Sequence, residues 1–78
     1  MNYYVSEATI MQILSSGGYI EKVLGFSPGI FLHNKDGEHV GYVRRDTLKK
    51  MRDAEIISFA MDDKRGVYVY ELLKGEAQ

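Results

Sequence analysis

The chain lacks cysteine and tryptophan and contains a single proline, Pro28. Without cysteine it can form neither disulfides nor a thiolate metal site, and nothing points to an oxidising compartment. No stretch approaches the roughly 18 apolar residues of a membrane span, and no basic residue precedes an apolar run at the start, as a secretory signal requires. These absences predict a cytoplasmic protein with no membrane partner.

The chain is also short, with 78 residues and a mass of 8.9 kDa. A chain of this size buries only about 60% of the surface that its unfolded form exposes. We therefore expect one domain over residues 1–78 and no large internal active site. Hydrophobic residues make up 45% of the sequence, too large a share for a disordered chain.

Groups that could support catalysis or bind a metal are few. The serines have no histidine partner at a recognisable spacing, and Gly17-Gly18 lacks the lysine and hydroxyl residue of a phosphate loop. His33 and His39 flank a predicted turn, but two ligands fall short of the four that a structural zinc site needs. We expect no enzymatic activity, no cofactor and no metal.

The first half of the chain predicts one helix and three strands. Ser6 is a good helix N-cap and Gly17-Gly18 a good exit, and the apolar residues between them recur at helical spacing. A short strand is predicted at 19–24. Two further strands, at 30–33 and 39–43, flank an Asp-Gly step that is typical of a hairpin. Gly41 in the second of these indicates a bulge.

The second half predicts a helix followed by another hairpin. Residues 44–55 are good helix formers without glycine or proline, and one side of this helix carries the expected core residues Thr47, Leu48, Met51 and Ala54. Two strands, at 56–61 and 67–72, flank a charged turn. The predicted class is α+β.

The charges are segregated along the chain. The net charge is only −1, which argues against an indiscriminate polyanion binder. Residues 44–52, however, carry five basic groups and one acidic group, for +4. Arg45, Lys49 and Arg52 fall on one side of the predicted helix, away from its apolar stripe. The alternative for these charges is a solvated surface with pairs such as Lys49 with Asp53.

The predicted order of elements resembles the winged-helix family. The elements that carry the resemblance are a helix, a strand, a basic helix that runs into Ile56-Ile57, and a hairpin with a charged turn. The form is atypical, because a hairpin stands in place of the usual second helix. The stretch most similar to the family is 43–57. The resemblance implies a recognition helix in the major groove of double-stranded DNA and a wing tip against the backbone. Carried onto this chain, the DNA-binding residues would be Arg44, Arg45, Lys49, Lys50, Arg52, Lys64 and Arg65.

Two functions follow as expectations. The first is a small DNA-binding regulator of transcription or of a mobile element, acting as a homodimer that doubles the basic surface. The second is a phage-encoded interaction module or inhibitor of a host protein complex on the same scaffold, without DNA binding. Four tyrosines are candidates for a protein interface, with burial in the core as the alternative. They are Tyr3, Tyr4, Tyr68 and Tyr70.

Overall fold

The computed structural model describes residues 4–25 and 28–73. In this part of the chain the elements are, in order, α1 (Glu7–Ser15), β1 (Tyr19–Val23), β2 (Gly29–His33), β3 (His39–Tyr42), α2 (Arg45–Asp53), β4 (Ile57–Asp62) and β5 (Val67–Leu72). The predicted α+β class is confirmed. Every predicted helix and strand is present, with ends that differ by no more than two residues.

The five strands form one antiparallel sheet in the order β3-β2-β1-β5-β4. The two predicted hairpins are therefore not separate units, because β1 pairs with β5 and joins them. Helix α2 connects the two edge strands, β3 and β4. This strand order does not confirm a winged-helix topology, which stays a prediction.

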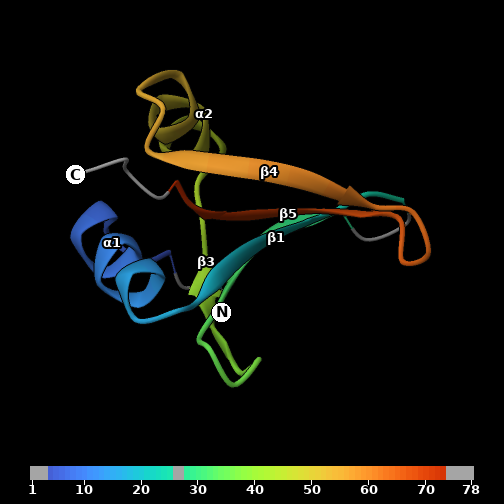
Figure 1. Ribbon diagram of the computed structural model, residues 1–78, viewed down its shortest axis with the longest axis horizontal. Coiled ribbons are helices and arrows are strands. Elements are labelled where there is room, and N and C mark those ends of the chain that lie inside the picture. The colour runs from blue at the N-terminus through green and yellow to red at the C-terminus, as the bar shows by residue number, and fades with distance from the viewer. Residues whose placement is uncertain (1–3, 26–27, 74–78) are drawn as a thin grey trace.

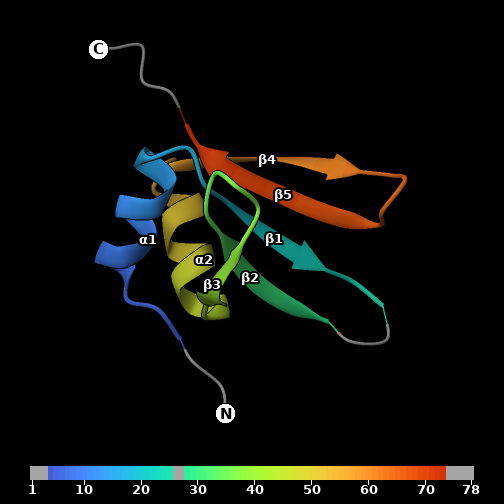
Figure 2. The same ribbon diagram turned by 90° about the horizontal axis from the view of Figure 1, so that it is seen from below.

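The two helices lie side by side at one end of the sheet, and the β4–β5 hairpin extends away from them (Figures 1 and 2). A contact between Lys50 Nζ of α2 and Glu7 Oε1 of α1, at 3.4 Å, spans the two helices. As a result only one end of the sheet is covered by helices.

The core lies between the helices and one face of the sheet. Because strand side chains alternate between faces, Ile20, Leu32 and Tyr70 from three neighbouring strands point the same way. The core consists of these three with Val5, Ile10, Leu14, Ile30, Val43, Leu48, Met51 and Ile57. Of the core residues expected on α2, Leu48 and Met51 are buried and Thr47 is half-buried. The expectation for Ala54 is wrong, because the helix ends at Asp53 and Ala54 is exposed.

Aromatic rings cover much of the other face of the sheet. Phe31 lies 5.3 Å from Tyr42 and 5.5 Å from His39, measured between ring centroids, and Tyr19 stacks on His33 at 5.0 Å. No helix of the described residues packs there. Rings from β1, β2 and β3 thus pack against one another on this face.

The first hairpin follows its predicted turn and bulge. Asn34 Oδ1 accepts hydrogen bonds from the backbone N–H groups of Asp36 and Glu38, both at 3.0 Å, and Gly37 has a φ of 86°, which favours glycine. The register then shifts between Leu32 and His33, beside Gly41. The bulge indicated by Gly41 is confirmed.

Helix α1 begins and ends as its sequence predicts. The Ser6 hydroxyl accepts a hydrogen bond from the Thr9 N–H at 3.2 Å, which satisfies one free donor of the first turn. At the other end Gly17 has a φ of 101°, and the Gly18 N–H donates to the Ile13 carbonyl at 2.9 Å. This is a Schellman motif, in which a left-handed residue closes the last turn.

Helix α2 closes with the same motif but without glycine. The Glu55 N–H donates to the Arg52 carbonyl and the Ile56 N–H to the Met51 carbonyl, both at 3.0 Å. Glu55 has a φ of 58°, the left-handed region that a side chain disfavours. The turn that starts β4 is therefore strained at one residue.

Replacing Glu55 with glycine should relieve that strain. The left-handed conformation costs an ordinary residue roughly 1–2 kcal/mol, and the greater unfolded-state entropy of glycine offsets about 0.4–1 kcal/mol of the gain. We expect Glu55→Gly to raise the free energy of unfolding by about 0.5–1 kcal/mol in chemical denaturation. Glu55→Ala, which keeps the Cβ, is the control and should show no such gain. Equal effects of the two variants would contradict this explanation.

Candidate nucleic-acid interface

Two buried side chains fix the orientation of α2. Leu48 and Met51 are 4% and 0% exposed and anchor the helix on the sheet. Because these two side chains are in the core, the rotation of α2 about its axis is set. The side of the helix that carries Arg45, Lys49 and Arg52, the basic stripe, therefore has a defined orientation. All three are exposed.

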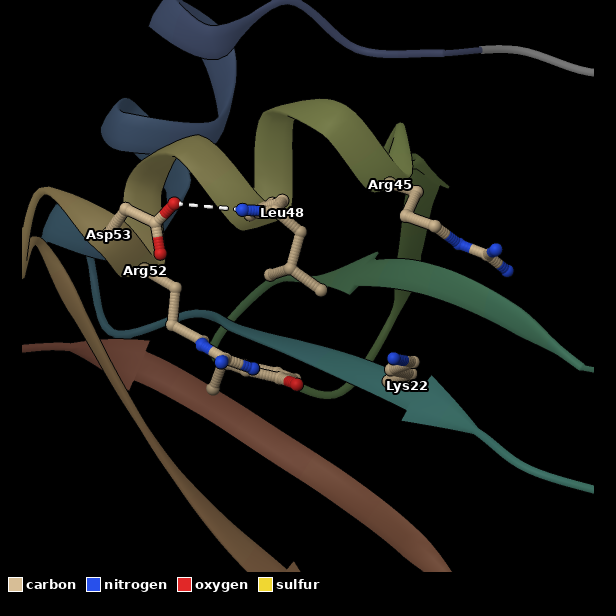
Figure 3. A pocket seen from close by; sticks show the side chains of 7 residues that line it. Lys22, Arg45, Leu48, Arg52 and Asp53 are labelled. Atoms are coloured by element: carbon tan, nitrogen blue, oxygen red, sulfur yellow. Dashed lines mark hydrogen bonds and ion pairs between the residues drawn. The ribbon is translucent and has the colours of Figure 1, made fainter.

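Contrary to the prediction that it faces away from the apolar stripe of α2, the basic stripe borders Leu48 of that apolar stripe. Its three side chains line a pocket between α2 and the sheet, together with Lys22 of β1 (Figure 3). Leu48 points from the helix into this pocket, and Tyr70 of β5 also lines it. Arg45 and Lys22 lie toward one end, and Arg52 toward the other (Figure 3). We call this feature the α2 groove.

The α2 groove is strongly cationic. Four of its lining residues are basic, and Asp53 is the one carboxylate among them, so the lining carries a formal charge of +3. Asp53 Oδ2 lies 3.2 Å from Lys49 Nζ, and both side chains are well exposed. An exposed pair of this kind contributes only about 0–1 kcal/mol, so Lys49 can readily exchange this partner for another anion.

An exposed aromatic ring continues the groove on β4. The Arg52 guanidinium lies 5.9 Å from the ring centroid of Phe59, and this ring is 53% exposed. Tyr68 of β5 packs edge-on against Phe59 at 5.6 Å. An apolar surface therefore lies directly beside the cations.

The other basic residues of the α2 segment have different partners. Lys50 turns to Glu7 of α1, as described above. The Arg44 guanidinium lies 4.6 Å from the centroid of the Tyr4 ring, a cation–π contact. Of the five predicted DNA contacts in this segment, the structure brings together Arg45, Lys49 and Arg52.

The charged turn of the second hairpin does not join the α2 groove. Arg65 pairs with Glu21 of β1, whose side chain is buried in a residue only 6% exposed. The Nη1 atom of Arg65 also lies 3.9 Å from Asp62 Oδ2. Glu21 is the neighbour of Lys22 and so points to the opposite face of the sheet. His33 Nε2 also lies 3.2 Å from Glu21 Oε1. Arg65 therefore compensates a buried charge, while Lys64 is exposed in the turn.

The four candidate interface tyrosines have different environments. Tyr70 is 2% exposed and belongs to the core, which is the alternative that the sequence left open for it. Tyr68 is half-buried, and Tyr4 is 45% exposed beneath Arg44. Tyr3 lies outside the described residues.

Sequence reasoning missed Lys22 and Phe59. The signal for Lys22 was present, because strand alternation from Ile20 puts Lys22 on the core face and close to the next element that covers it. Phe59 gave no signal, since a phenylalanine in a strand is normally expected in the core.

The described residues were compared with the requirements of a metal site and of a membrane-spanning helix. The rings of His33 and His39 lie 5.9 Å apart, but no group of three or more His, Cys, Asp or Glu residues in 4–25 and 28–73 could hold a metal ion. Neither described helix is long and apolar enough to cross a membrane.

Comparison of the chain with protein-family models, curated proteins and solved structures found no match.

Removing the Arg65 side chain should destabilise the fold. It would leave the Glu21 carboxylate buried without its guanidinium partner. Arg65 is more than half exposed, so solvent screens its interaction with Glu21 and reduces the stability that is lost with it. We expect Arg65→Ala to lower the free energy of unfolding by about 1–2 kcal/mol. Lys64→Ala, its neighbour in the turn, should change it by less than about 0.5 kcal/mol. Similar losses in chemical denaturation would rule out a specific role for Arg65.

Proposed function

We propose that the protein binds DNA through the α2 groove. The observation that carries this proposal is the meeting of Arg45, Lys49 and Arg52 with Lys22, a cation from a distant part of the chain. Guanidinium and ammonium groups on one surface are the usual partners of phosphate oxygens. Cations drawn from two separate elements favour a ligand with several phosphates over a single anion.

The size of the α2 groove supports a polymer rather than a small molecule. It holds about 200 Å³, whereas pockets for drug-sized ligands span roughly 300–1,000 Å³. A shallow cationic groove can instead follow part of a backbone that continues past it. Because the whole chain has a net charge of −1, attraction to DNA comes from this surface and not from the protein at large, so binding should be oriented.

Double-stranded DNA remains the proposed ligand, with α2 as the element that contacts it. A role as a regulator of transcription or of a mobile element, and the winged-helix likeness behind it, stay predictions. One part of that docking scheme loses support, since Arg65 is paired with Glu21 on the opposite face of the sheet. The other basic residue at the hairpin tip, Lys64, is exposed and lies outside the α2 groove.

A second candidate is a module that binds a host protein. Phe59 and Met61 of β4 are 53% and 51% exposed, and large apolar side chains together on a surface are typical of protein interfaces. This candidate predicts the same fold with no affinity for DNA. Binding to a labelled duplex at low salt separates the two.

The groove makes a quantitative prediction for binding. If its four cations each neutralise one phosphate of duplex DNA, the logarithm of affinity should fall with the logarithm of salt concentration at a slope near −3.6, from about −0.9 per phosphate. Removing three of them in Arg45→Ala/Lys49→Ala/Arg52→Ala should bring the slope to about −0.9 and abolish retention at moderate salt. Fluorescence anisotropy of a labelled duplex at several salt concentrations measures both quantities.

A matched variant controls for the loss of charge alone. Arg44→Ala/Lys50→Ala/Lys64→Ala removes the same formal charge outside the α2 groove. We expect it to keep most of the affinity and a slope within about one phosphate of the wild type. Circular dichroism should show both variants folded, since all six residues are exposed. Equal losses in the two variants, or no binding by the wild type at low salt, would reject the groove as the DNA site.

A further inference from the structure

The two edges of the sheet differ in how they are covered. At the β3 edge, Tyr4 forms a parallel bridge with Tyr42, and the Val5 N–H donates to the Tyr42 carbonyl at 3.0 Å. At the opposite edge, no strand of residues 4–25 and 28–73 pairs with the outer side of β4. The β3 edge is thus bridged by the chain itself at one residue, Tyr42, whereas the β4 edge has no such bridge within the described structure.

The open strand lacks the features that normally keep an edge from pairing. Residues 57–61 contain no charge and no proline, and β4 pairs with β5 in unbroken register over all six of its residues. Proteins usually protect an exposed edge with lysine, proline or a bulge. Here Phe59 and Met61 instead expose about half of their surfaces, at 53% and 51%. Such a strand is suited to accept another strand.

The ladder shows which backbone groups of β4 are free. The Leu73 N–H donates to the Ile56 carbonyl at 2.8 Å, and hydrogen-bonded pairs alternate along an antiparallel ladder. Ser58 and Ala60 therefore bond to β5, while the N–H and C=O groups of Phe59 and Met61 point to the open side. Of the residues whose backbone groups point to the open side, Ile57 is buried, whereas Phe59 and Met61 carry the exposed large apolar side chains of β4.

We propose that β4 pairs antiparallel with β4 of a second copy of this chain, which forms a homodimer with a continuous sheet. The occupant is a second copy because the strand is complementary to itself. With Phe59 opposite Phe59 of the second copy, Ile57 lies opposite Met61, and no charge falls between them. Asp62 of each copy is placed at opposite ends of the interface, so the two carboxylates do not meet.

The symmetry of this pairing determines where the helices lie. A twofold axis between antiparallel neighbours in one sheet runs perpendicular to the sheet and keeps each face on its own side. Both α2 helices then lie on the same side of the continuous sheet. The dimer therefore presents two α2 grooves in one direction, although the pairing itself does not depend on DNA binding.

Sedimentation velocity tests the dimer, with Met61→Lys as the disrupting variant. We expect the wild type to sediment as a dimer of two 8.9 kDa chains at high micromolar concentration, and Met61→Lys as a monomer, because a lysine on the edge opposes pairing. The matched control is Leu24→Lys, at a residue 42% exposed beyond the end of β1 and away from the edge. It should remain dimeric.

Amide hydrogen exchange in the wild type tests the same interface without a substitution. The Phe59 and Met61 amides should exchange at least about tenfold more slowly at high protein concentration than at low concentration, while the Ser58 and Ala60 amides, bonded to β5, should not respond. The proposal is overturned if the wild type stays monomeric at millimolar concentration. In that case a different protein would be the partner of the β4 edge. A dimer that persists in Met61→Lys also overturns the proposal, as does exchange at Phe59 and Met61 that does not depend on concentration.

Discussion

The pairing of β1 with β5 is the interaction on which the rest of the structure depends. It brings residues 19–23 against residues 67–72 and unites two hairpins that are far apart in the chain. The register sets Lys22 opposite Tyr68 and Glu21 opposite Val69. Lys22 therefore faces α2, and Glu21 reaches Arg65 on the other side. Without this pairing neither the α2 groove nor the Arg65–Glu21 contact would form.

The same pairing separates the charges of a nearly neutral chain between two faces of the sheet. On the helix side, Lys22 adds to the cations of α2. On the other side, Arg65 is used to compensate Glu21, with His33 beside them. A buried carboxylate requires such a partner, since an isolated buried charge is strongly unfavourable. The hairpin tip and α2 both carry basic residues, but these residues have different partners in the fold.

Local structure was predictable because local residues cause it. The Ser6 cap, the Gly17-Gly18 exit and the Asp36-Gly37 turn act within four or five residues, and each is present as expected. The bulge beside Gly41 belongs to the same class. The α2 helix shows the limit of this reasoning at its end. Ala54 fits the apolar spacing, but the left-handed Glu55 ends the helix before Ala54 can reach the core.

The sequence by itself determined the elements, their order, the core side of each helix and the grouping of Arg45, Lys49 and Arg52, since periodicity and capping act over short distances. Only the tertiary structure decided the strand order, the burial of Tyr70 and the addition of Lys22 to the basic stripe. It also decided that Arg65 points away from that stripe and that β4 is the outermost strand at one edge of the described sheet. These features depend on which strands become neighbours, and that choice is made by packing among residues that can lie fifty or more positions apart, which no local pattern records.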